Sequence, residues 1–192
     1  ESDAPVVVKL GGGLLETPGA LEASVQAVAA LALRWRVVVV PGGGPLADAV
    51  RRLDERVGLS DDAAHWMAIL AMAQYAHVLA ERIERSVRVE EPGGIAEAFA
   101  AGRVAVLAPS RWMRSADVLP HTWDATSDSV AAFVAGALGA RHLVLVKPAD
   151  GEPEALVDRC FTLVVPAGLP WTAVGWRSLG EVPALVERSA SA

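Results

Sequence analysis

Two lysines and two glycine runs are the residues of this chain whose types and spacing suit the handling of an anion. Of the seventeen lysine and arginine residues, only Lys9 and Lys147 are lysines, and each follows a run of apolar residues. A lysine ammonium is a compact charge on a flexible stem, which suits it to follow a phosphoryl group. The glycine runs Gly11–Gly13 and Gly42–Gly44 would let backbone N–H groups approach an anion closely. The pattern indicates two phosphate-sized sites with a cation beside the first.

A polar stretch from 119 to 129 contains carboxylates that would complete such a site. It includes Asp124 and Asp128, with the hydroxyls of Thr126 and Ser127 between them. The expected first turn of a helix favours a carboxylate at Asp128 by about 0.3–1 kcal/mol, whatever its function. A carboxylate close to Lys9 would also orient the ammonium group and keep it charged. A cation with backbone amides and no obvious nucleophile is typical of phosphoryl transfer.

Three further side chains are candidates for contact with a substrate. His65 begins a long apolar helix near the predicted sheet edge, and His121 lies in the polar stretch. Asp48 lies one turn into the helix after the second glycine run, where it could favour the helix dipole or meet a cation on the substrate. The histidines are too dispersed to predict a metal site, and Cys160 is the single cysteine.

The elements that position these residues alternate between strands and helices. Runs of β-branched residues predict strands buried on both faces, as in a parallel sheet. The sequence therefore predicts an α/β protein, a three-layer α/β/α sandwich around a mostly parallel sheet, in a single domain over 1–192. The end, 189–192, is expected to fray. The expected strands are 5–10, 37–40, 87–89, 104–107, 142–146 and 161–165, and the expected helices are 17–34, 45–57, 61–85, 92–101, 129–138 and 181–187.

Composition narrows the classes of function. The formal net charge of −6 argues against nucleic acid and anionic membranes as partners. The most apolar segment, 63–80, contains two histidines and a glutamine, so it reads as a buried helix rather than a membrane span. Its centre, 66–73, is apolar all round, which implies burial on several sides or packing against another subunit. A homo-oligomer, a dimer or higher, is expected. With no basic leader pattern and one cysteine, a cytoplasmic location is expected.

Four motifs, in order along the chain, resemble the amino acid kinase family, which includes acetylglutamate, aspartate, uridylate and isopentenyl phosphate kinases. They are residues 9–13, 41–44, 126–132 and 147–151. The resemblance implies the amino acid kinase, or carbamate kinase-like, fold. It also implies an acceptor half, about 1–115, and a nucleotide half, about 116–188, that binds ATP with Mg²⁺ held through the ATP phosphates.

The resemblance also implies roles for individual residues. Lys9 would stabilise the transferring phosphoryl group, and Asp128 would organise that lysine. The residues implied for ATP are Gly11, Gly12, Gly13, Lys147, Asp150 and Gly151. The residues implied for the acceptor are Gly42, Gly43, Gly44, Asp48, His65, His121 and Asp124.

Within the family, residues 64–69 and 120–124 look most like the kinases of [5-(aminomethyl)furan-3-yl]methyl phosphate, which serve methanofuran biosynthesis in one-carbon metabolism. That likeness implies conversion of a small phosphate monoester into a diphosphate. The chain departs from the family in Gly13, where serine is common, and in the absence of a lysine after Gly151, a gap that Lys147 could fill.

Two alternatives remain open. The short C-terminal part favours a non-catalytic, oligomeric protein of the same fold that binds a nucleotide or oxyanion. A dinucleotide-dependent oxidoreductase is disfavoured, because neither glycine run has the Gly-x-Gly-x-x-Gly spacing.

Overall fold

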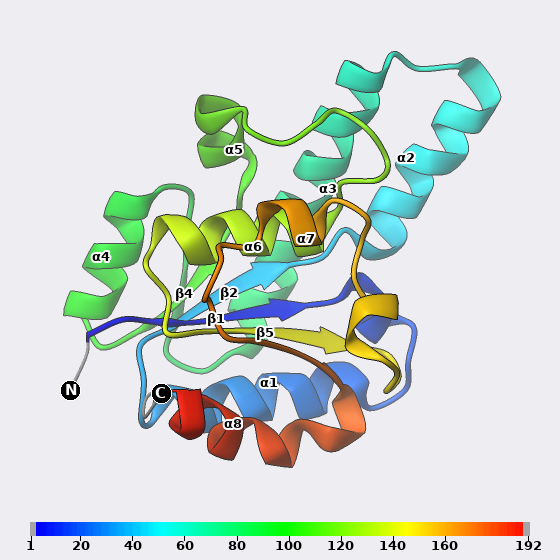
Figure 1. The fold of residues 1–192 in the computed structure, drawn as a ribbon. Helices are drawn as coiled ribbons and strands as arrows, with labels where there is room; N and C mark the ends of the chain where they lie inside the picture. Colours follow the sequence, from blue (N-terminus) through cyan, green and yellow to red (C-terminus); the bar gives the residue numbers. More distant parts are fainter. Residues whose placement is uncertain (1–2, 190–192) are drawn as a thin grey trace.

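The computed structural model describes residues 3–189 and contains one six-stranded sheet (Figure 1). The strand order is β3-β4-β2-β1-β5-β6, and every neighbouring pair is parallel. β-Branched residues and leucine dominate the central strands and are buried on both faces, as parallel sheets require. The strands are β1 (Val6–Leu10), β2 (Val37–Pro41), β3 (Ser86–Val89), β4 (Val104–Leu107), β5 (His142–Lys147) and β6 (Trp171–Gly175).

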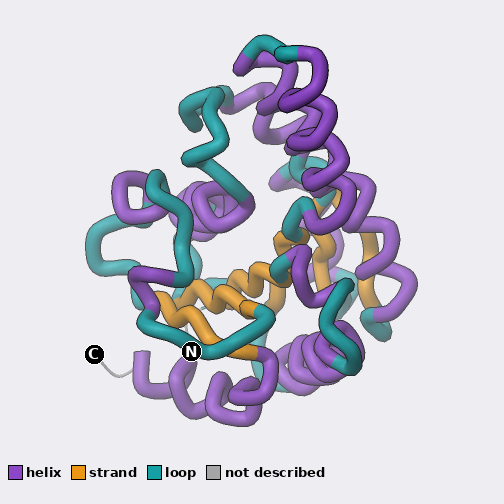
Figure 2. Tube along the Cα trace, turned by 90° about the vertical axis from the view of Figure 1, so that its right-hand side faces the viewer, coloured by secondary structure: helices purple, strands orange, loops and turns teal. Residues whose placement is uncertain are grey.

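Strand order decides which loops meet. β1 lies between β2 and β5, so the strand that carries Lys9 adjoins both the second glycine run and the strand that carries Lys147. All three strands point the same way, and their carboxyl ends face the viewer in Figure 2. The residues singled out by the sequence therefore gather at one edge of the sheet, where ligands of open α/β folds bind.

Helices cover both faces of the sheet (Figures 1 and 2). Alternate strand residues point into two separate cores, with Val6 and Val8 in one and Val7 in the other. The first core packs against α1 (Ala20–Ala32) and α8 (Val182–Ser189), and the second against α4 (Pro92–Ala100), α5 (Ser110–Ala116) and α6 (Ser127–Ala137). The three-layer α/β/α prediction is confirmed. The remaining elements are α2 (Gly44–Val57), α3 (Asp61–Arg82), α7 (Phe161–Val164), and the 3₁₀ helices η1 (Gly12–Leu15), η2 (Pro153–Ala155) and η3 (Trp176–Glu181).

The long helix α3 contributes to both cores. Ile69 and Met72 near its middle belong to one core, and Tyr75 and Leu79, further along, belong to the other. Ser60 caps its start by accepting a hydrogen bond from Ala63 N at 3.2 Å. Among residues 3–189, no helix combines the length and the apolarity that crossing a membrane would take.

One predicted strand is wrong. The predicted strand 161–165 is instead helix α7, which ends at Val164, and the sixth strand is Trp171–Gly175. The segment bends into a helix because Phe161 is fully buried beside α6, where its ring meets Trp171 edge-on at 4.8 Å. A short apolar run fits either a helix or a strand, so the periodicity of this segment could not distinguish between them. Ser189, expected to fray, is the last residue of α8, and 190–192 lie outside the described residues.

Candidate active site

The two glycine loops are packed directly against each other. A Cβ on Gly12 would lie 2.0 Å from the backbone nitrogen of Gly44, and one on Gly42 would lie 2.5 Å from the nitrogen of Gly12. Neither position has room for any side chain. Hydrogen bonds from Gly11 N to Val146 O (3.1 Å) and from Gly42 N to Leu10 O (2.8 Å) anchor both loops to the sheet. The two glycine loops predicted to bind anions are therefore adjacent halves of one surface.

Four backbone N–H groups of this surface are free to bind an anion. Within residues 3–189, the amides of Gly12, Gly13, Gly43 and Gly44 donate to no acceptor. Gly12 begins η1 and Gly44 begins α2, so these are the unsatisfied amides of two helix starts. All four glycines line the same cavity. Such a group of amides attracts phosphate oxygens.

A buried carboxylate bridges the two lysines beside these loops. Lys9 Nζ lies 2.9 Å from Asp128 Oδ1, and Lys147 Nζ lies 2.7 Å from Asp128 Oδ2. The relative exposure of the three residues is 4%, 8% and 4% for Lys9, Lys147 and Asp128. A Cβ on Gly11 would lie 3.5 Å from Lys9 Nζ, which places that ammonium beside the first glycine loop. The group carries one excess positive charge close to the free amides.

Burial and charge act in opposite directions on the pKa values of this group. Burial alone would raise the pKa of Asp128, but the charges of Lys9 and Lys147 outweigh it and hold that pKa below its ordinary value. Burial, helped by the charge of Lys9, lowers the pKa of Lys147 to about 8, against the raising effect of Asp128 and Asp158. Lys147 therefore loses its proton more easily than a surface lysine does.

A cavity of about 260 Å³ opens from the glycine loops. Its other walls come from α2, α3 and the stretch before α6. Asp48 and His65, both predicted, line it, and so does Asp61, which the sequence analysis did not single out. Asp48 is paired with Arg51 at 3.1 Å, so two carboxylates and one arginine face the space. The cavity lining is Gly12, Gly13, Gly43, Gly44, Ala47, Asp48, Arg51, Asp61, Ala64, His65, Ala68, Ile69, Met72, Thr122, Trp123, Ala125, Thr126 and Ser127.

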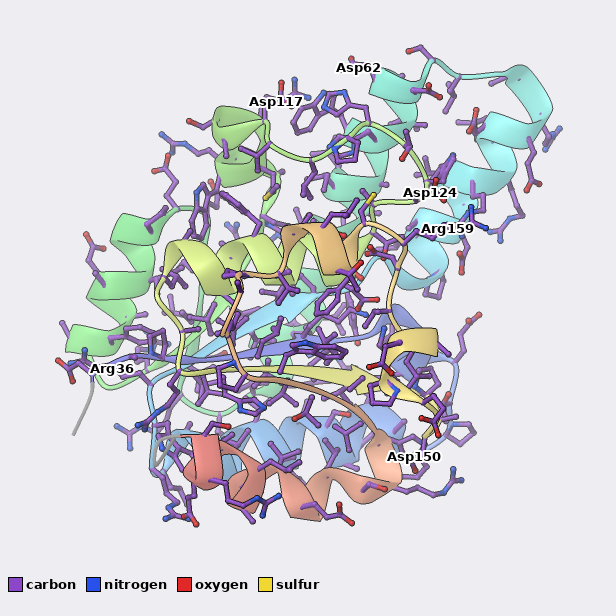
Figure 3. The ribbon with its side chains drawn as sticks, viewed as in Figure 1. Arg36, Asp62, Asp117, Asp124, Asp150 and Arg159 are labelled. Atoms are coloured by element: carbon purple, nitrogen blue, oxygen red, sulfur yellow. The ribbon has the colours of Figure 1, made fainter. Side chains whose placement is uncertain are left out.

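The two predicted histidines lie together above this cavity. Their rings stack with centroids 4.1 Å apart. His121 is held between Asp117 (Nε2–Oδ1, 2.8 Å) and Asp62 (Nδ1–Oδ1, 3.0 Å), both labelled in Figure 3. Burial, with the charge of His121, lowers the pKa of His65 against the opposing effect of the two aspartates. His65 therefore loses its proton more easily than a free imidazole does, and the ring of His121 packs against it.

The structure places the other predicted residues away from the cavity wall. Asp124 is exposed and pairs with Arg159 at 3.2 Å. Both residues are labelled in Figure 3. Asp150 accepts hydrogen bonds from Gly175 N at 2.7 Å and Ser178 Oγ at 3.1 Å. These contacts hold the last strand and η3 to the end of β5. The roles expected for Asp124 toward the acceptor, and for Asp150 and Gly151 toward ATP, stay predictions.

Trp123 and Asp158 support the site but were not predicted. Trp123 lines the cavity, donates from Nε1 to Asp54 at 2.9 Å and lies under the Arg51 guanidinium at 4.5 Å. Asp158 accepts hydrogen bonds from the start of α6. Both depend on residues more than twenty-five positions away in the sequence. Local spacing gives no signal for either.

These features define an α/β protein with free glycine amides and a lysine pair at the carboxyl ends of its parallel strands. The chain belongs to the amino acid kinase family, whose model matches residues 4–151. It is 28% identical to the [5-(aminomethyl)furan-3-yl]methyl phosphate kinase of Methanocaldococcus jannaschii, over 76% of this chain and 66% of that protein. It is 30% identical to a uridylate kinase of Hyperthermus butylicus, over 83% of this chain and 70% of that protein.

Solved structures support the same fold. The uridylate kinase of Archaeoglobus fulgidus superposes with a TM-score of 0.60 at 22% identity, over 77% of this chain and 64% of that chain. The aspartate kinase of Synechocystis superposes with a TM-score of 0.66 at 15% identity, over 91% of this chain and 39% of that chain. The chain thus spans just under two thirds of the Methanocaldococcus jannaschii phosphate kinase and of the Archaeoglobus fulgidus uridylate kinase.

Proposed function

We propose that this chain is an ATP-dependent kinase that phosphorylates a small molecule already carrying a phosphate. The observation that carries the proposal is the buried Lys9–Asp128–Lys147 group beside four free glycine amides. Two buried ammonium groups sharing one carboxylate leave a net positive charge that a transferring phosphoryl group would neutralise. The named relatives, a phosphate kinase and a uridylate kinase, support a kinase of phosphate-bearing acceptors.

In this proposal the chain mainly positions the reactants and stabilises charge. An oxygen of the acceptor phosphate forms a bond to the γ-phosphorus of ATP while the bond to the β,γ-bridging oxygen breaks, releasing ADP. Lys9 and Lys147 stabilise the negative charge on the moving group, and Asp128 keeps both ammonium groups in place. The amides of Gly12 and Gly13 hold ATP phosphates, and those of Gly43 and Gly44 hold the acceptor phosphate.

Mg²⁺ fits this proposal as a companion of ATP rather than as an ion held by the chain. Among residues 3–189, no group of three histidine, cysteine or carboxylate side chains is arranged to hold a metal ion. Asp128 already binds two ammonium groups, so it is not free as a ligand. Bound through the ATP phosphates, Mg²⁺ would neutralise part of their charge.

The cavity supports an acceptor with a cationic end as well as a phosphate. Asp61 and Asp48 face the space whose floor is the glycine amides. A molecule with a phosphate at one end and an amine at the other would match both. [5-(Aminomethyl)furan-3-yl]methyl phosphate has this character, and its conversion to the diphosphate in methanofuran biosynthesis is our specific proposal, resting on the likeness to the named phosphate kinase.

An ADP-release assay over a panel of acceptors tests the proposal. The panel contains aminomethylfuran phosphate, its dephosphorylated form, uridylate, isopentenyl phosphate, acetylglutamate and aspartate. We expect turnover of phosphate monoesters, greatest for the one carrying an amine, and none of the dephosphorylated compound. Turnover of acetylglutamate or aspartate alone would reject the acceptor class while keeping the kinase.

Lys9→Ala is the control that ties turnover to this site. Removing a charge aimed at the transition state costs several kcal/mol, so we expect a loss of about 10²–10³-fold in kcat. The melting temperature should confirm a folded protein. Near-normal turnover in Lys9→Ala would exclude the assigned role in phosphoryl transfer.

The second candidate is a non-catalytic protein that binds a nucleotide or oxyanion. It is favoured by the matched segment ending at residue 151, which leaves β6, η3 and α8 outside the family match. Binding of ATP without turnover of any acceptor would support it. We also propose a homo-oligomer, because Leu70 on α3 is 48% exposed in the single chain; sedimentation analysis would test it.

A further inference from the structure

Asp158 holds an unusually large number of hydrogen bonds for a carboxylate with no role in the proposed chemistry. It lies between η2 and α7, and both its oxygens accept. Thr126 donates from N (2.9 Å) and Oγ1 (2.8 Å), and Ser129 donates from N (3.0 Å) and Oγ (2.5 Å). Cys160 N donates a fifth hydrogen bond at 3.1 Å.

These donors are the start of helix α6. Thr126 is the N-cap of that helix, but its own side chain makes no capping hydrogen bond. Asp158 takes over this function from a distant part of the chain, binding the amides of Thr126 and Ser129. Asp128 lies between these two anchored residues, so its backbone is fixed on both sides.

The segment that runs from Lys147 to Asp158 contacts the start of α6 through its first and its last residue. Lys147 closes β5 and binds the Asp128 carboxylate at 2.7 Å. Eleven positions later, Asp158 binds the backbone on either side of Asp128. Because a carboxylate already fills the N-terminus of α6, the amides of Thr126 and Ser129 are not available to nucleotide phosphates.

We propose that Asp158 is a positioning residue that fixes the start of α6 and thereby holds Asp128 between Lys9 and Lys147. The effect of this positioning on catalysis rests on the proposed function, whereas its effect on the place of Asp128 does not. The charge of Asp158 also helps to raise the pKa of Lys147, together with Asp128 and against burial and Lys9. Loss of that charge should therefore change the titration of Lys147, which loss of helix stability alone would not do.

Asp158→Asn tests the catalytic part. Its amide keeps the shape but brings N–H groups against the donors of α6. We expect kcat to fall about 10–100-fold, as when an orienting partner is removed, with KM values within about threefold. The fall of kcat/KM at high pH should begin at a lower pH than in the wild type. Ser129→Ala removes one donor but keeps the charge of Asp158, so it should lower kcat less and leave the pH profile close to that of the wild type.

Val28→Ala is the matched control for stability. Val28 belongs to α1 and is buried in the core on the face of the sheet opposite to α6. At a similar loss of melting temperature, it should leave kcat and the pH profile unchanged. If Val28→Ala reproduced the changes of Asp158→Asn, the positioning role would be rejected.

A measurement without turnover separates this proposal from the proposed function. The chain has two lysines, so ¹⁵N-lysine labelling gives two side-chain Nζ signals, and Lys9→Arg assigns them. The pKa of Lys147 read from its signal should be lower in Asp158→Asn than in the wild type. An unchanged value would overturn the proposal, even if the chain proves to be a kinase. A lowered value would support it, even if no acceptor is found.

Discussion

At the scale of single residues, the proposed activity depends on two ammonium groups that share one buried carboxylate. Lys9 and Lys147 contact different oxygens of Asp128. Two cations this close to one another would repel without that anion, and burial would remove the water that could screen them. Lys9 and Asp128 therefore act in opposite directions on the pKa of Lys147, the first lowering it and the second raising it.

Activity should fall as the pH rises through about 8. The charged form of Lys147 is the form that stabilises a phosphoryl group, and its pKa is lowered to about 8, first by burial and then by Lys9. We expect kcat/KM, which reports the ionisation of the free enzyme, to decrease above that pH. Lys147→Arg stays charged in this range and should lack the loss, whatever its absolute activity. A fall at the same pH in Lys147→Arg would assign it to another group.

Asp128→Asn should lower both activity and stability, most clearly near neutral pH. The substitution leaves two buried ammonium groups without their partner, at a cost of about 3–5 kcal/mol. Burial then drives Lys147 further toward its neutral form, while the unfolded chain keeps the proton. The unfolded state binds more protons, so stability rises with pH. Because Lys147 of the folded wild type loses its proton only near pH 8, melting temperatures from about pH 6 to 9 should show the gap to the wild type narrowing up to that pH and constant above it. A gap that is constant throughout would argue against an uncompensated charge.

At the scale of elements, the two glycine loops act as one unit because their backbones touch. Gly12→Ala would place a methyl group 2.0 Å from the nitrogen of Gly44. We expect a lower melting temperature and loss of binding to both ATP and the acceptor, measured by calorimetry. Gly93→Ala, in α4, meets no atom within 4 Å and should stabilise the protein by up to about 1 kcal/mol. Normal ligand binding by Gly12→Ala would show that the loops can separate.

The amino end of β5 should make the fold sensitive to acid. His142 contacts Ser189 Oγ in α8 at 2.8 Å and Thr172 Oγ1 in β6 at 3.0 Å, and burial lowers its pKa to about 4. The unfolded chain takes up this proton near pH 6.5 and the folded chain only near 4. Stability is therefore complete above about 6.5 and falls by about 3 kcal/mol toward pH 4.

His142→Gln isolates this contribution because glutamine does not titrate. The difference in melting temperature between the variant and the wild type should change with pH between 6.5 and 4 and be constant above that interval. The lowered pKa of His65 acts in both proteins and so cancels in the comparison. Parallel curves through the whole range would show that His142 is not the sensitive group.

The sequence predicted those elements whose own residues determine them. Valine runs identified β1 and β2. Of the six glycines that follow these runs, four have free amides that line the cavity, whereas the amides of Gly11 and Gly42 donate to the sheet. The segment 161–165 was misread because its helix depends on packing against α6. Lys147 was predicted as a site residue, but its contact with Asp128 was not. That contact depends on β5 lying beside β1, and the sequence does not reveal this strand order.

At the scale of the whole molecule, the cavity joins parts of the chain that are far apart. Its wall combines residues from α2 and α3 with residues from the stretch before α6. Trp123 bridges them, because its Nε1 donates to Asp54 at the end of α2. Asp61 and Trp123 could not be found from spacing, since their positions depend on how these helices pack.

The placement of the lysines has a practical consequence for chemical labelling. Both lysines of the sequence lie in the site, and neither is more than 8% exposed. The exposed basic side chains are therefore arginines and histidines, so no surface lysine competes for an amine-selective reagent. Side-chain acylation by an amine-selective ester should therefore proceed only as fast as the site opens. Mass spectrometry of Lys9 and Lys147 peptides should show slow modification, slower still with ATP bound. The reagent would then measure occupancy of the site directly, without an enzymatic assay or an identified acceptor.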